Sequence, residues 1–126
     1  MVVRLSRARF EALVEEALRG IPGELRGALD NVEVAVEERP TREQLASVGL
    51  GPDDELFGLY LGTPLPERSP LAPYTLPDVI SIFQRPLEEA CATEDEIREE
   101  IRRTVVHEIA HYFGIDEDRL AELGYE

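Results

Sequence analysis

The chain has 126 residues, enough for one domain that buries a core without disulfide bonds. Its net charge is −14 and every basic residue is arginine, which argues against binding to nucleic acid or an anionic membrane. No apolar run reaches membrane-spanning length, and no signal peptide is visible. The single Cys91 cannot form an internal disulfide, so we predict a packing role for it and one cytoplasmic domain over residues 1–126.

The first third of the chain predicts helices around one strand. Ser6 is a good N-cap, and apolar residues follow it at helical spacing until Gly20. Valines then alternate with other residues, as in a half-buried strand, and a capping-box pattern begins at Thr41. The expected elements are a helix that Ser6 caps and that ends at Gly20, a short helix over 22–29, a strand over 32–37 and a helical turn between Thr41 and Gly49.

Two further strands are expected in the middle of the chain, over residues 56–61 and 79–84. Between them lies the segment 62–77, which contains five prolines and has no periodicity. Loops of this length in a small domain are commonly functional. The segment is therefore either a rim or lid over a site, or a proline-stiffened excursion on the surface.

The longest predicted helix begins at a capping box formed by Thr93 and Glu96 and ends at Gly114. One apolar stripe follows it at intervals of four residues: Ile97, Ile101, Val105 and Ile109. A short helix over 117–123 follows. Helices and strands are segregated along the chain, so we predict an α+β fold in which a small mixed or antiparallel sheet packs against the long helix.

This long helix carries the sequence His107-Glu108-Ile109-Ala110-His111, which contains both histidines of the chain. Two imidazoles four residues apart lie on one helix face and can reach one metal ion. Glu108 is rotated off that face, where it can act as the general base of a zinc hydrolase. The alternative is a purely structural pair of histidines without metal.

A catalytic zinc ion takes a third protein ligand and keeps one position open. Gly114 follows the second histidine by three residues and permits a sharp turn back toward the metal. The next position of that extended pattern is Glu117, so His107, His111 and Glu117 are the predicted ligands. Asp116 and Asp118 remain alternatives, because this acidic run can also cap and start the next helix.

These residues predict a Zn²⁺-dependent peptidase acting on a peptide or protein, with Glu108 taking a proton from the attacking water. An oxyanion stabiliser is also needed, and nothing in the sequence ranks the donors Tyr60, Tyr74, Tyr112 and Arg68. The rival prediction is a zinc-binding or interaction protein that no longer cleaves anything.

The chain resembles the small bacterial zincin-like metallopeptidase family. The resemblance is carried by residues 10–22, 31–34, 59–65, 77–83 and, most specifically, 104–114. It implies a minimal zincin fold with a compact sheet over the H-E-x-x-H helix, the pair of histidines and the glutamate falling on His107, His111 and Glu108. The acidic position after the glycine, usually aspartate, falls on Glu117. The larger metzincins differ, because this chain has no third histidine and Met1 is its only methionine.

Overall fold

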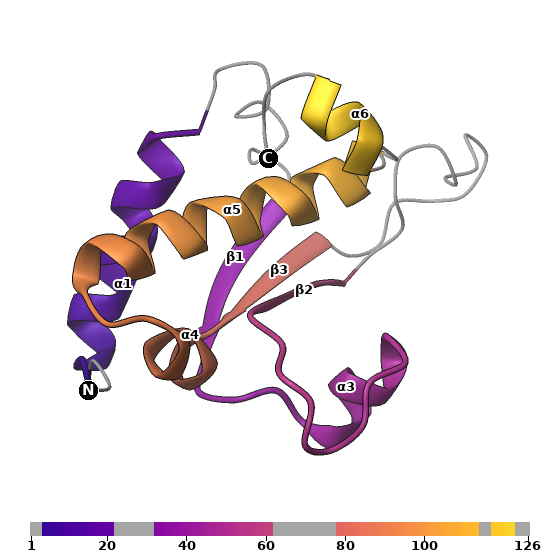
Figure 1. Ribbon diagram of the computed structural model, residues 1–126, viewed down its shortest axis with the longest axis horizontal. Coiled ribbons are helices and arrows are strands. Elements are labelled where there is room, and N and C mark those ends of the chain that lie inside the picture. The colour runs from indigo at the N-terminus through magenta and orange to yellow at the C-terminus, as the bar shows by residue number, and fades with distance from the viewer. Residues whose placement is uncertain (1–3, 22–31, 62–77, 114–116, 123–126) are drawn as a thin grey trace.

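The computed structural model describes residues 4–21, 32–61, 78–113 and 117–122 (Figure 1). Its helices are α1 (Arg7–Arg19), α3 (Arg42–Ser47), α4 (Gln84–Ala90), α5 (Glu94–Phe113) and α6 (Glu117–Glu122), and its strands are β1 (Val32–Glu37), β2 (Gly58–Leu61) and β3 (Asp78–Phe83).

The three strands form one mixed sheet in the order β1-β3-β2. β1 runs parallel to the central strand β3, and β2 pairs with it antiparallel, so that Tyr60 lies opposite Ile80. β3 is buried along almost its whole length, whereas β2 forms an edge of the sheet. The predicted α+β class and small mixed sheet are therefore confirmed.

Helix α5 crosses one face of this sheet, with α1 packed beside it (Figure 1). It begins where predicted: the Thr93 hydroxyl accepts from the Glu96 N–H at 3.1 Å, and the Glu96 carboxylate accepts from the Ala92 N–H at 2.9 Å. The predicted apolar stripe is fully buried, and its members are Ile97, Ile101, Val105 and Ile109. Each such side chain contributes on the order of 2 kcal/mol by leaving water, which fixes the helix against the sheet.

The other caps also agree with the sequence. The Ser6 hydroxyl accepts from the Arg9 N–H at 3.1 Å and opens α1. Thr41 and Gln44 form a complete capping box at the start of α3, with hydrogen bonds of 3.0 and 2.8 Å. Gly49 follows α3 at a φ of 79°, a conformation that favours glycine.

Two predicted strands differ from the observed ones, one helix was missed, and two predicted segments lie outside the described residues. The strand expected over 56–61 is shorter and begins at Gly58. The prediction for 79–84 was wrong at its end, because Gln84 begins α4, a helix that the sequence analysis missed. Pro86 occupies the first turn of α4, where its missing N–H costs nothing, and this was the available signal. The expected helix over 22–29 and the segment 62–77 cannot be compared.

Candidate active site

The H-E-x-x-H residues lie in the last two turns of α5, the helix that the buried stripe holds against the sheet. His107 is exposed, whereas Glu108, the next residue around the helix, is half-buried on the side that faces β2. The backbone of His111 follows His107 by one helical turn. The predicted helical placement of the motif is therefore present, and the proposed base lies between helix and sheet.

The carboxylate of Glu108 accepts a hydrogen bond from the backbone N–H of Tyr60 in β2. Burial raises the pKa of Glu108 to about 7, and the hydrogen bond from Tyr60 opposes that rise without cancelling it. A carboxyl group with a pKa near neutrality can both accept and release a proton under physiological conditions. The pKa of Glu108 therefore lies in the range where its carboxyl group exchanges a proton near neutral pH.

This environment predicts a stability that depends on pH in protein stripped of metal with a chelator. The pKa of Glu108 rises from 4.5 to about 7 on folding, so the folded state binds more protons between these values. The contribution of protonated Glu108 to the free energy of unfolding is complete below pH 4.5. It is lost as the pH rises through about 7. Because the carboxyl group keeps some contact with solvent, we expect a loss on the order of 2 kcal/mol.

Urea unfolding of the wild type and of Glu108→Gln, each at pH 5 and pH 8, measures this effect. Glutamine cannot ionise, so the difference in free energy of unfolding between the two proteins should change with pH in favour of the variant at pH 8. If the difference in free energy of unfolding is the same at both pH values, the predicted pH dependence is contradicted.

The strand that contacts Glu108 lies at one edge of the sheet that the described residues form. Phe83 N donates to Phe57 O at 2.9 Å, which identifies these two residues as a hydrogen-bonded pair of the antiparallel ladder. Pairs alternate along such a ladder, so the N–H and C=O groups of Gly58 and Tyr60 point away from β3. The N–H of Tyr60 that reaches Glu108 lies on this outer edge.

Tyr60 is also held through its side chain. Its hydroxyl donates to the carboxylate of buried Asp78 at 2.6 Å, across the sheet from β2 to the start of β3. The hydroxyl proton of Tyr60 is therefore used within the core, which argues against this hydroxyl as the oxyanion donor. The other candidates cannot be compared: Tyr74 and Arg68 lie in 62–77, and the side chain of Tyr112 is outside the described part.

The metal ligands predicted from the sequence are not all among the described side chains. Those of His111 and Glu117 lie outside the description, although α6 does begin at Glu117 as expected. The side chain of Asp118 is exposed. Among the side chains that are described, no three His, Cys, Asp or Glu groups are arranged to hold a metal ion. The donor set of two imidazoles and a carboxylate suits zinc, and it stays a prediction.

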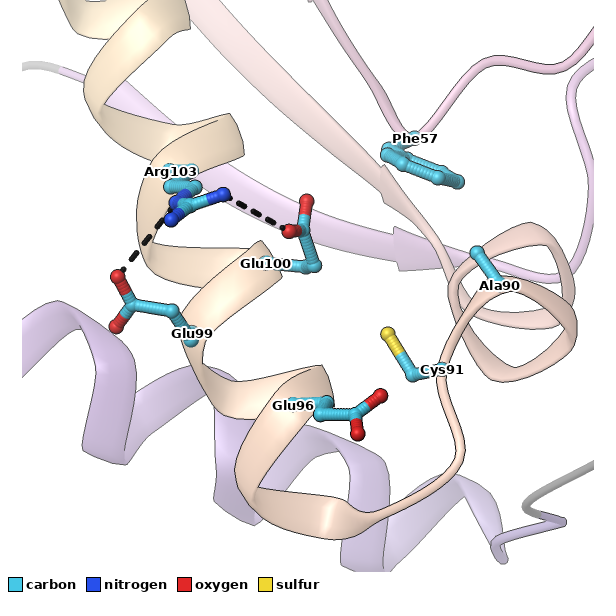
Figure 2. A pocket seen from close by; sticks show the side chains of 7 residues that line it. All are labelled: Phe57, Ala90, Cys91, Glu96, Glu99, Glu100 and Arg103. Carbon is cyan, nitrogen blue, oxygen red and sulfur yellow. Dashed lines mark hydrogen bonds and ion pairs between the residues drawn. The ribbon is translucent and has the colours of Figure 1, made fainter. Parts of the chain in front are cut away.

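A cavity of about 410 Å³ lies along the first half of α5, facing α4 (Figure 2). It is lined by Phe57, Ala90, Cys91, Glu96, Glu99, Glu100 and Arg103. Figure 2 shows Arg103 joined to both Glu99 and Glu100, so the cation in this wall is engaged by the carboxylates around it. Neither His107 nor Glu108 lines the cavity, which is therefore separate from the candidate active site.

Cys91 points into this cavity but is itself buried (Figure 2). Burial raises the pKa of its thiol, and the nearby carboxylates of Glu100 and Glu96 raise it further. A thiol held in its protonated form is a poor nucleophile. The structure therefore agrees with the predicted packing role of Cys91.

The chain is similar to a known protein family and to a solved structure. A family model described as zincin-like metallopeptidase matches residues 29–125, well over half of the chain. A solved structure of a conserved hypothetical protein from Thermo thermophilus is similar, with a TM-score of 0.57, 22% identity, and coverage of 96% of this chain and 100% of that one. That likeness shows the fold alone. No curated protein matches the chain. No helix within the described residues is long and apolar enough to cross a membrane.

Proposed function

Because this chain belongs to the zincin-like metallopeptidase family, we propose that it is a zinc-dependent peptidase with Glu108 as its general base. His107, His111 and Glu117 would hold the metal, as their spacing predicts. When bound, zinc supplies a Lewis acid for the scissile carbonyl and lowers the pKa of water toward ~7.

One observation carries the proposal: the half-buried carboxylate of Glu108 is held by a strand at the edge of the sheet and has a pKa of about 7. In the proposed mechanism Glu108 takes the proton of the attacking water and passes it to the leaving amine. Such a shuttle needs a group whose two protonation states are close in free energy at the working pH. An exposed glutamate on the same helix has no reason to meet that condition.

The outer edge of β2 supports a peptide as the substrate. The N–H and C=O groups of Gly58 point to this edge, beside the Tyr60 N–H that binds Glu108. An extended peptide that adds itself as a further strand would use these groups and would pass next to the base. The proposed substrate is therefore an unfolded peptide segment or a protein loop that can adopt an extended conformation.

A cleavage screen with removal and return of the metal tests this function. We expect the protein to cut some members of a diverse peptide library, to stop after treatment with 1,10-phenanthroline, and to recover with about one equivalent of zinc. The non-chelating 1,7 isomer of phenanthroline is the control and should have no effect. Stoichiometric zinc without cleavage of any peptide would instead favour a metal-binding or interaction protein.

A further inference from the structure

Helix α5 and strand β2 lie close together at Gly58. A Cβ atom built on this residue would overlap the Cγ2 atom of Thr104 and would lie 3.2 Å from the backbone oxygen of Ser81. The Ser81 oxygen belongs to the rigid backbone of β3. Thr104 has a β-branched side chain with little rotameric freedom. The two elements can therefore lie this close only because position 58 has no side chain.

The contact of Gly58 with Thr104 and the hydrogen bond from Tyr60 to Glu108 both join β2 to α5, one after the other along the two elements. Thr104 and Glu108 are one turn apart on α5, which separates them by about 6 Å along the helix axis. Gly58 and Tyr60 are two residues apart on β2, which separates them by about 6.7 Å along the strand. The two spacings nearly match, so a strand seated at Thr104 presents its next outward-pointing N–H, that of Tyr60, at the level of Glu108.

We infer that Gly58 is a positioning residue for the base: the missing side chain at this position lets β2 pack closely against α5 at Thr104 and thereby holds the Tyr60 N–H on the Glu108 carboxylate. The catalytic meaning of this arrangement rests on the proposed function. The arrangement itself does not rest on that function, because the hydrogen bond from Tyr60 to Glu108 can be measured without any enzymatic activity.

Amide hydrogen exchange, measured by NMR, follows the bond directly. In Gly58→Ala the added Cβ pushes β2 away from α5, and the Tyr60 amide should exchange about tenfold faster, the equivalent of one lost hydrogen bond. The amides of Leu59 and Leu61 point toward β3 and should change much less. General unfolding would speed all three amides together, so the contrast separates positioning from lost stability.

A second substitution provides the rescue. Thr104→Ser removes the Cγ2 atom that the new Cβ would overlap, so the Tyr60 amide in Gly58→Ala/Thr104→Ser should return to within about threefold of the wild type. Thr104→Ser alone should exchange like the wild type. Gly51→Ala is the matched control, because a Cβ there would meet only the Asp54 carboxylate at an ordinary 3.6 Å.

The outcomes separate this inference from the proposed function. Where the wild type cleaves peptides, kcat/KM should fall about tenfold in Gly58→Ala and recover in the double variant, in step with the Tyr60 amide. A wild type without cleavage would overturn the function and leave the amide measurements valid. A folded Gly58→Ala with an unchanged Tyr60 amide would overturn the inference.

If Gly58→Ala is too unstable for NMR, the Glu108→Gln variant keeps the inference testable. At pH 8, replacing the carboxylate by a neutral amide weakens the acceptor, so the Tyr60 amide proton should shift upfield while those of Leu59 and Leu61 stay nearly unchanged. Recovery of the fold in Gly58→Ala/Thr104→Ser would then support the seating contact. An unchanged chemical shift of the Tyr60 amide proton in Glu108→Gln would overturn the inference.

Discussion

Replacing Glu108 by glutamine is expected to lower kcat/KM for peptide cleavage by about 10²- to 10⁴-fold, the usual contribution of a general base. The amide has nearly the same shape as the carboxyl group, and its oxygen can still accept the hydrogen bond from Tyr60. The variant cannot take up a proton near neutral pH, however. The fold and the proposed zinc ligands should therefore be retained while turnover is lost.

The measurement combines peptide kinetics with metal analysis by mass spectrometry. Glu99→Gln is a matched control on the same helix, because Glu99 is paired with Arg102 at 2.6 Å and that hydrogen bond keeps the pKa of Glu99 low. It should cleave peptides like the wild type, since exposed ion pairs contribute little to stability. Undiminished cleavage in Glu108→Gln would remove the base from the mechanism.

The features predicted well from the sequence are those encoded over short distances. The stripe from Ile97 to Ile109 predicts both the helix and its buried face, because an amphipathic helix of this length is determined by its own periodicity. The capping residues are equally local. The H-E-x-x-H motif needs only a helix to place its histidines, so its position on α5 could also be predicted.

The surroundings of Glu108 could not be predicted in this way. They depend on β2 lying at the sheet edge and against α5. Tyr60 and Glu108 are far apart in the chain, so no local sequence pattern predicts their contact. In the sequence, Gly58 marks this contact, but a glycine inside a predicted strand is more simply interpreted as a bulge or as a weak point of the strand. Helix α4 was missed for a related reason: it follows β3 directly, without a side-chain cap to mark its start.

Replacing His111 by alanine is expected to weaken zinc binding by at least about a hundredfold, more than the loss of a group that merely orients a ligand. The chain contains only two histidines, so no other imidazole can take its place. His107→Ala should have an effect of the same size, because each residue supplies one of the two nitrogen ligands. Competition for zinc against a chromophoric chelator measures both affinities.

Arg103→Ala is the control for these variants, since Arg103 is exposed on α5 one turn before His107 and its side chain reaches the carboxylates of Glu99 and Glu100. It should bind zinc like the wild type. If both histidine variants also kept their zinc, the metal would lie elsewhere and the histidines would be structural.

The same competition assay identifies the third ligand. Glu117→Ala should weaken binding strongly, whereas Asp116→Ala and Asp118→Ala should not. A carboxylate that binds zinc from α6 would also join this helix to the end of α5, so the wild type should gain thermal stability on adding zinc and Glu117→Ala should gain less.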